Sequence, residues 1–291
     1  MLNLENSVCV VTGAGSGIGQ ALALGLAKRG ANLALSDVNE SALANTQGLL
    51  ADSGVQVHAQ VLDVSDRDAV FSYAKTVDEY FGRVNLLINN AGVALSSGLF
   101  RDTTIDEFEW LMSINFSGVL YGTKAFLPSL EKSEWGQIVN LSSLFGLIGV
   151  AEQSAYNSSK FAVRGFTESL ANEFEETHSS VRATSVHPGG IKTNIARNAR
   201  LGELLDQEQR QEVESRKANF DKVAKTTAES AAEQIIDGAV RRKRRVVVGT
   251  DAKLLDKIQR LLPTRYNAIF VWLKNKLSGD EEALSVSRST Q

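Results

Sequence analysis

Short β-branched apolar runs alternate along this 291-residue chain with longer segments of helical periodicity. Seven such runs lie within residues 7–13, 31–37, 55–64, 85–92, 136–143, 181–189 and 244–250. Strands that alternate with helices build crossover units, which make the strands parallel and place helices on both faces of the sheet. The sequence therefore predicts one α/β domain over residues 1–250 with a doubly wound, parallel, seven-stranded sheet. Residues 251–291 are expected to form a helical C-terminal extension with a polar tail.

The bulk composition is that of a globular protein, with 43% hydrophobic residues, 22% charged residues and 3 prolines. The single cysteine, Cys9, has no partner for an intramolecular disulfide and fits a reducing compartment. The N-terminus lacks a basic segment followed by a long apolar one, and no stretch approaches the roughly 18 apolar residues of a spanning helix. We therefore expect a cytoplasmic protein.

A glycine-rich turn follows the first predicted strand in VVTGAGSGIGQALALG. Backbone without side chains can approach a pyrophosphate, whose charge is held by free N–H groups and the positive end of the next helix. A glycine-rich turn alone is equally compatible with a plain tight turn. The strand before it, the helix after it and a later acid favour a nucleotide site in a Rossmann-like fold. The residues predicted to bind the dinucleotide here are Gly13, Ser16, Gly17, Ile18 and Gly19.

The later acid is Asp37, which ends the second predicted strand. A carboxylate there can accept hydrogen bonds from the ribose of NAD and would repel a 2′-phosphate. Ser16 and Val38 bring no positive charge to bind such a phosphate. NAD is therefore predicted over NADP, with an NADPH-dependent carbonyl reductase as the alternative. Asp63 and Val64 end the third strand, where the adenine would lie, although Asp63 could equally be a helix N-cap.

Tyr156 precedes Lys160 by four residues in SAYNSSKFAV. On a helix this spacing places the phenol and the ammonium on one face. A neighbouring cation favours the phenolate, so Tyr156 could act as an acid or base near neutral pH. Two residues at this spacing also fit a surface lysine packed along a half-buried tyrosine, and other motifs must decide between the two.

Several motifs occur together in a fixed order. They are TGAGSGIG from Thr12, the acid Asp37, NNAG from Asn89, Asn115, the pair Ser142–Ser143, YNSSK from Tyr156 and HPGGIKT from His187. In this order and spacing, residues 5–250 resemble the short-chain dehydrogenase/reductase family.

The resemblance implies a role for each matching residue. Tyr156 would be the acid/base at the substrate oxygen, and Ser143 would hydrogen-bond the same oxygen. Lys160 would lower the pKa of Tyr156 and hold the nicotinamide ribose, while Asn115 would anchor a proton-relaying water. Further cofactor contacts are implied for Asn90, Ala91, Gly92, Pro188, Gly189 and Thr193. Ser142 is expected to be structural, His187 to be a loop residue near the cofactor, and Gly190 has no assigned role.

The predicted function is hydride transfer between a nicotinamide cofactor and a hydrophobic secondary alcohol or ketone. The apolar stretch SLFGLIGV after Ser142, with Val93, Ala94 and Leu95, would line the substrate site. A non-catalytic dinucleotide sensor on the same fold is the competing hypothesis, and the intact set of catalytic residues argues against it. The resemblance also implies a homodimer or homotetramer.

Neither a metal site nor a nucleic-acid surface is predicted. The three histidines are isolated from one another and from any second cysteine. A basic surplus is local: 11 Lys and Arg stand against two acids between Arg241 and Lys276, and aromatic residues do not interleave with the basic run.

Two segments lie outside the family pattern. Residues 189–230 form a charged connection long enough for a substrate lid, or for a solvated helical insertion. Residues 252–277 carry apolar stripes beside basic residues. Such helices can lie on an anionic membrane surface, but folding back to close the substrate site is the favoured expectation.

Overall fold

The computed structural model describes residues 1–269, except for the side chains of residues 216–223. Its centre is a sheet of seven strands, and every neighbouring pair is parallel. In sheet order the strands are β11 (Arg245–Val248), β7 (Val181–Pro188), β6 (Gly136–Leu141), β4 (Leu86–Asn89), β1 (Val8–Thr12), β2 (Asn32–Asp37) and β3 (Val57–Val61). The predicted fold class is confirmed, and each of the seven predicted runs contains one of these strands.

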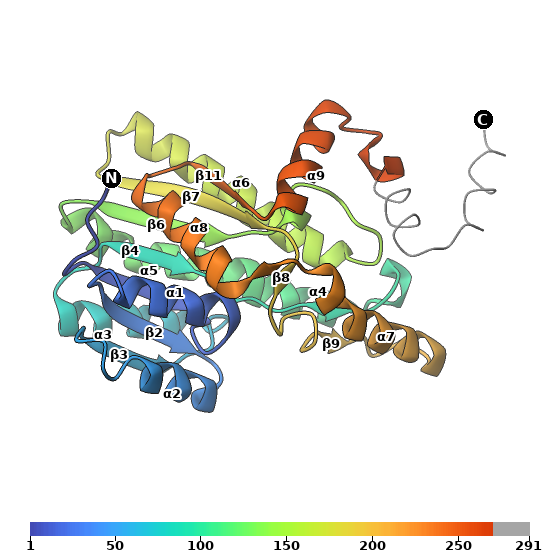
Figure 1. Cartoon of the computed structure of the whole chain (residues 1–291), viewed down its shortest axis with the longest axis horizontal. Coiled ribbons are helices and arrows are strands. Elements are labelled where there is room, and N and C mark those ends of the chain that lie inside the picture. Colours follow the sequence, from blue (N-terminus) through green and yellow to red (C-terminus); the bar gives the residue numbers. More distant parts are fainter. Residues whose placement is uncertain (270–291) are drawn as a thin grey trace.

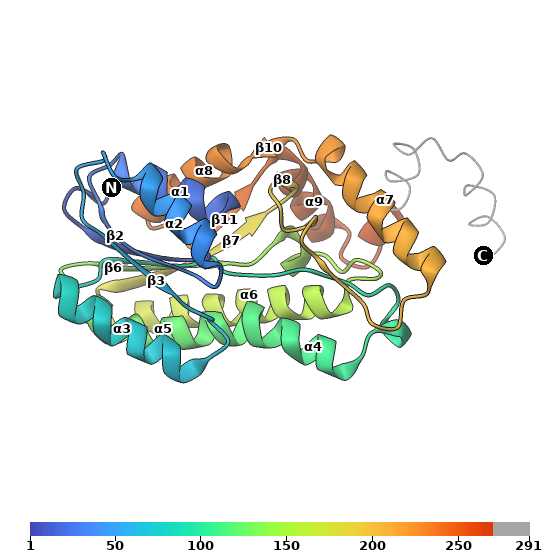
Figure 2. The same ribbon diagram turned by 90° about the horizontal axis from the view of Figure 1, so that it is seen from below.

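Helices cover both faces of the sheet (Figures 1 and 2). One layer contains α1 (Gly17–Ala27), α2 (Glu40–Leu49) and α8 (Ala228–Val240), and the other contains α3 (Arg67–Phe81), α4 (Ile105–Met112), α5 (Gly118–Lys132) and α6 (Ser154–Glu176). Each layer encloses its own apolar core against the sheet. The central strands are therefore buried on both faces, which explains their continuous apolar sequence.

Helix ends follow the local sequence. The Asn39 side chain accepts from Ala42 N at 2.9 Å and caps α2, and the Asp66 side chain caps α3 by accepting from Ala69 N at 3.0 Å. Gly82 ends α3 with φ 72°, a left-handed conformation that glycine adopts without steric cost. The alternative that Asp63 is a helix N-cap is wrong, because Asp66 occupies that position.

The long connection between β7 and α8 contains β8 (Ile191–Lys192), β9 (Arg200–Leu201), α7 (Gln207–Val223) and β10 (Thr226–Thr227). Strand β9 pairs with β5 (Leu95–Ser96), just after the NNAG motif. The buried carboxylate of Glu107 accepts from Glu203 N at 2.8 Å and from Thr104 N at 2.9 Å. One side chain therefore caps α4 and attaches this connection to it.

The described part of the C-terminal extension folds back onto the body. Helix α9 spans Thr250–Leu261, and the apolar cluster of Ala252, Leu255 and Tyr266 packs against residues 144–150. The apolar and basic positions from 270 onward, on which the membrane-surface alternative partly depends, lie outside the described residues. Within residues 1–269, no helix is long and apolar enough to cross a membrane.

Candidate active site

The glycine-rich turn joins β1 to α1 at the carboxyl edge of the sheet. Gly13 and Gly17 have φ of 65° and 54°, values that favour glycine. A Cβ on Gly19 would lie 2.0 Å from the carbonyl oxygen of Gly13, and one on Gly13 would lie 2.8 Å from Ala91 Cα. Side chains are therefore excluded where backbone must approach backbone, leaving the start of α1 open to an anion.

Thr12, the last residue of β1, and Asn90, which follows β4, hold this turn in place. The Thr12 hydroxyl accepts from the backbone N–H groups of Asn90 and Ala91, both at 3.1 Å. The Asn90 amide donates to the carbonyl oxygens of Thr12 at 2.9 Å and Gly13 at 3.0 Å. The side chain of Asn90 therefore fixes the turn.

Asp37 closes the other side of the turn. Its Oδ2 accepts from Gly15 N at 2.8 Å and its Oδ1 from Asn39 N at 2.9 Å. Each carboxylate oxygen retains acceptor capacity for a ribose hydroxyl. Ser16 and Val38 are exposed and carry no charge. Of these three residues only Asp37 is charged, and its charge is negative.

Asp63 lies two residues beyond the end of β3. Its Oδ1 accepts from the backbone N–H and the hydroxyl of Ser65, at 2.9 and 2.7 Å. Val64 is buried, and its side chain lies 2.8 Å from the position that a Cβ on Gly118 would take. Asp63 therefore stabilises a turn; the predicted adenine contact remains a prediction for this residue and for Val64.

Ser143 and Tyr156 meet beyond the end of β6. Ser143 begins the short helix Leu144–Gly146, and Tyr156 lies in the first turn of α6. Burial raises the pKa of the Tyr156 phenol, and a hydrogen bond to the Ser143 side chain lowers it in part. The Phe145 ring lies edge-on to that of Tyr156, with centroids 6.0 Å apart. An acid group and a hydroxyl therefore share one apolar site.

Lys160 lies one turn further along α6, with its ammonium nitrogen 5.6 Å from the centre of the Tyr156 ring. The nitrogen donates to Leu141 O at 3.1 Å. Burial lowers the pKa of Lys160 to about 8. Burial of the phenol dominates the pKa of Tyr156 and raises it. That Lys160 lowers this pKa stays a prediction.

Asn115 lies in a π-helical segment, Ser113–Ser117, a departure from the α-helix that is frequent at functional sites. Its amide accepts from Val93 N at 2.8 Å and donates to Val93 O at 3.0 Å. A Cβ on Gly92 would lie 3.2 Å from Asn115 Oδ1 and 3.4 Å from Lys160 Nζ. Asn115 and Lys160 thus face each other across Gly92. The water-anchoring role remains a prediction.

Pro188 is the last residue of β7, and Gly189 begins the segment that follows the strand. The Thr193 side chain lies 3.2 Å from the position of a Cβ on Gly17. Gly189 donates its N–H to Val248 O at 3.0 Å. The Thr193 side chain therefore lies directly against the glycine turn.

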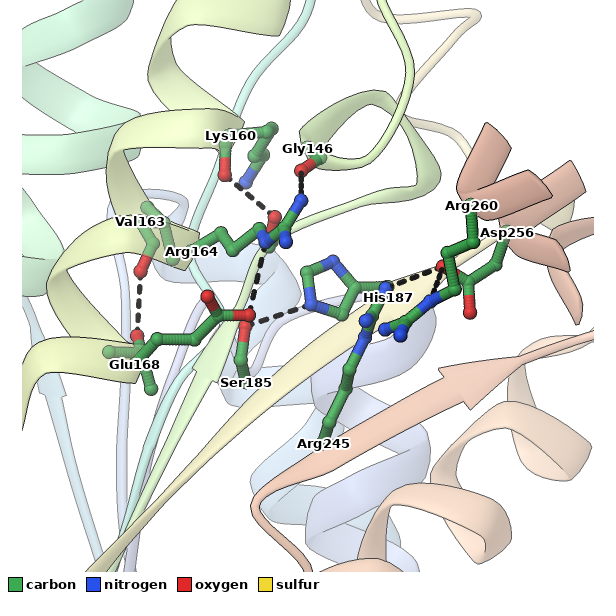
Figure 3. Close-up of polar contacts among 12 residues, drawn as sticks. Gly146, Lys160, Val163, Arg164, Glu168, Ser185, His187, Arg245, Asp256 and Arg260 are labelled. Carbon is green, nitrogen blue, oxygen red and sulfur yellow. Dashed lines mark hydrogen bonds and ion pairs between the residues drawn. The ribbon is translucent and has the colours of Figure 1, made fainter. Parts of the chain in front are cut away.

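His187 differs from its prediction: it is the seventh residue of β7, fully buried, and not a loop residue. Its ring bonds the Ser185 hydroxyl at 3.0 Å (Figure 3). The other ring nitrogen bonds the carbonyl oxygen of Ser143 at 3.1 Å. Burial lowers the pKa of His187 to about 4, so the ring is neutral. It fixes the backbone that presents the Ser143 hydroxyl.

Two further residues support the site. As predicted, Ser142 is structural, since its hydroxyl donates to Lys160 O at 2.7 Å. The Asn157 side chain donates to Phe145 O at 2.6 Å and Ile148 O at 2.7 Å, and it accepts from Val150 N at 3.1 Å. No sequence pattern had singled out Asn157; its position beside Tyr156 was the only signal.

No group of three His, Cys, Asp or Glu side chains that could hold a metal ion occurs in the described part of the chain.

Comparison with known proteins places these features in a family. The sequence model for short chain dehydrogenases matches residues 7–204. SadH of Mycobacterium tuberculosis, assigned as an oxidoreductase, is 45% identical over 269 residues, covering 92% of this chain and 95% of SadH. Human estradiol 17-beta-dehydrogenase 11 is 30% identical over 279 residues, or 95% and 85% of the two chains.

A solved structure has a similar fold. The short chain dehydrogenase/reductase of Burkholderia phymatum, in complex with NAD, superposes with a TM-score of 0.82 at 29% identity, covering 90% of this chain and 95% of the other. The matched segment contains the glycine turn, Ser143, Tyr156 and Lys160. The chain therefore belongs to the short-chain dehydrogenase/reductase family of oxidoreductases.

Proposed function

We propose that the protein transfers a hydride between NAD and a hydrophobic secondary alcohol or ketone. The observation that carries this proposal is the meeting of Ser143 and Tyr156 in one buried site, with the Lys160 nitrogen 5.6 Å from the centre of the Tyr156 ring, beside the glycine turn at the start of α1. A bound nicotinamide would supply or accept the hydride at its C4. The chain would hold it with Gly13, Gly17, Asp37, Gly92, Lys160 and Thr193.

Proton transfer is the part of the reaction performed by the chain itself. The phenol of Tyr156 gives a proton to the oxygen of a ketone that accepts hydride, or takes one from an alcohol that loses it. The Ser143 hydroxyl donates to the same oxygen and stabilises its developing charge. The Lys160 ammonium, held by Leu141 O, favours the ionised phenol and offers further donors to a ribose.

An apolar substrate is favoured by the surroundings of Tyr156. Its ring packs in a cluster with Val93, Phe108 and Trp110, and Phe145 contacts its edge. Leu95 is a buried member of this cluster and packs behind the residues that would line the substrate site. The name of the human relative, an estradiol dehydrogenase, points to the same class of hydrophobic secondary alcohol.

The experiment that tests the function is a panel of alcohols and ketones assayed with NAD, NADH, NADP and NADPH at the absorbance band of the reduced nicotinamide. We expect turnover of hydrophobic secondary alcohols or ketones, with NAD or NADH preferred. A protein that binds NAD but turns over nothing in the panel would be a sensor.

Asp37→Ala should weaken NAD binding about 10- to 100-fold, because hydrogen bonds to a charged group contribute about 1.5–3 kcal/mol. The preference for NAD over NADP should narrow as the negative charge is removed. Asp37→Asn provides the matched control, since it keeps an acceptor for Gly15 N and removes only the charge. The dissociation constants of NADH and NADPH, measured by the fluorescence of the reduced nicotinamide, test this prediction. A wild type with higher kcat/KM for NADPH than for NADH contradicts the proposal.

The pH dependence follows from the raised pKa of Tyr156. Burial keeps the phenol protonated at neutral pH, which suits ketone reduction. Alcohol oxidation requires the ionised form, so its kcat/KM should rise steadily from pH 6 to pH 9 while that of ketone reduction stays level or falls. Steady-state profiles in both directions test this, and an oxidation rate independent of pH would contradict the acid/base role.

We propose a homodimer or homotetramer that associates through α5 and α6. Leu120 and Phe161 are exposed on these helices, at 37% and 40% of their full areas, and apolar side chains favour an interface. Light scattering of the purified protein measures the assembly, and Phe161→Glu should reduce its mass.

A cytoplasmic location is proposed from the single cysteine. Cys9 is fully buried in β1, and burial raises the pKa of its thiol to about 12, so it stays a protonated, unreactive side chain. Fractionation of cells that express the full chain tests the location.

A further inference from the structure

Two loops border the proposed reaction site. The substrate loop is defined as residues 144–150, which follow Ser143. The cofactor loop is defined as residues 188–193, which begin at the last residue of β7. Helix α9 follows β11 at the edge of the sheet (Figure 1). The C-terminal segment that it begins contacts both loops.

Asp251, in the first turn of α9, contacts the cofactor loop. Its Oδ2 accepts from Gly190 N at 2.7 Å. A Cβ on Gly189 would lie 2.3 Å from the same oxygen. The carboxylate can therefore reach the Gly190 N–H only because Gly189, the first glycine of HPGG, has no side chain.

Tyr266, beyond the end of α9, contacts the substrate loop. Its hydroxyl accepts from Gly149 N at 2.8 Å. Its ring belongs to the apolar cluster in which Ala252 and Leu255 pack against Leu144, Leu147 and Ile148. The loop is therefore held on this side by the C-terminal segment, and by Asn157 on the side of α6.

A separate ion pair attaches α9 to the sheet. Asp256 Oδ1 accepts from Arg245 of β11 at 2.7 Å and from Arg260 at 3.1 Å (Figure 3). Only 14% of the Asp256 side chain and 20% of the Arg245 side chain are exposed. The position of α9 therefore does not depend on either loop contact alone, and the two contacts can be removed one at a time.

We propose that Asp251 and Tyr266 are positioning residues, Asp251 setting the cofactor loop and Tyr266 setting the substrate loop and with it substrate selectivity. The inference rests on the proposed function, because it takes these loops to face the nicotinamide and the substrate. It predicts two separable effects: loss of the Asp251 contact acts on cofactor binding, and loss of the Tyr266 hydroxyl acts on the choice of substrate.

The positional claim is tested by amide hydrogen exchange on the full chain. Tyr266→Phe keeps the ring and should speed exchange at Gly149 about 3- to 10-fold, the loss of one hydrogen bond, while Gly190 exchanges as in the wild type. Asp251→Ala should speed exchange at Gly190 and leave Gly149 as in the wild type. Asp251→Asn should keep Gly190 protected, because it retains an acceptor oxygen. Leu261→Ala, 79% exposed on α9, is the control that should change neither.

The functional claim is tested with the same variants. Tyr266→Phe should raise KM for large ketones about 3- to 10-fold relative to small ones and leave the NAD dissociation constant unchanged, whereas Asp251→Ala should raise that dissociation constant by a similar factor. The inference is overturned if the variants leave exchange at Gly149 and Gly190 as in the wild type. It is also overturned if both Tyr266→Phe and Asp251→Ala keep the substrate selectivity and the NAD affinity of the wild type. Altered exchange and NAD affinity in a protein that turns over no alcohol or ketone would support the positioning roles and contradict only the proposed function.

Discussion

Tyr156→Phe should lower turnover at least a hundredfold and leave NAD binding close to that of the wild type. The substitution removes only the phenol hydroxyl that exchanges the proton, and such acid/base catalysis contributes about 10² to 10⁴ in rate. The phenylalanine ring keeps the edge contact with Phe145 and the packing of the apolar cluster. Steady-state kinetics on the best substrate of the panel, with fluorescence titration of NADH, measures both properties.

Tyr80→Phe is the matched control for this variant. Tyr80 lies on α3 with 55% of its area exposed, far along the chain from the site. Its variant should retain wild-type kinetics. If Tyr156→Phe retains more than about a hundredth of the wild-type rate, another group performs the proton transfer.

Lys160→Met should abolish most activity and also weaken NAD binding, a combination that separates it from the tyrosine variant. Methionine fills a similar volume but provides neither the charge that favours an ionised phenol nor donors for a ribose. The measurements are again kcat/KM and the NAD dissociation constant. Wild-type NAD affinity in this variant would remove Lys160 from the cofactor site.

The same variant should be more stable than the wild type at neutral pH. The fall of the Lys160 pKa from 10.5 to about 8 corresponds to about 3 kcal/mol of unfavourable free energy at full effect. The lost bond to Leu141 O offsets about 1 kcal/mol or more of the gain. Because the unfolded chain binds the extra proton between pH 8 and 10.5, the penalty is complete below pH 8 and disappears as the pH rises through this window.

Thermal unfolding without cofactor, at pH 7 and at pH 10, measures this effect. The Tm of Lys160→Met should exceed that of the wild type by several degrees at pH 7, and the difference should shrink at pH 10. Lys75→Met, on the exposed side of α3, should show no such change. A Tm below that of the wild type at pH 7 would contradict the view that burial destabilises the Lys160 ammonium.

The fold could be predicted because its signals are local. Strand β1 is buried at all five positions, and its first four residues, VCVV, are all apolar. Helix α3 ends at Phe81, directly before a glycine. The glycine turn could also be identified locally, since strand, turn and helix occur within about twenty residues. Periodicity and turn chemistry act over such short distances.

The supporting residues of the site could not be predicted in this way. The sequence predicts a loop residue at His187, whereas β11 pairs with its strand as far as Pro188. Gly149 and Tyr266 are 117 positions apart, and Gly190 and Asp251 are 61 apart. The spacing of residues along a single segment carries no information about which loops meet. The direction of the Tyr156 pKa also depends on burial, which only the packed structure defines.

The contact between Gly149 and Tyr266 has a consequence for the order in which the protein matures during synthesis. Ribosomes add about 5–20 residues each second, and folding proceeds from the N-terminus. Strands β1, β2, β3 and β4 and the glycine turn are complete by residue 92, long before Tyr266 emerges. The nucleotide half can therefore assemble early, whereas the substrate loop reaches its final support only when the last part of the chain has been made.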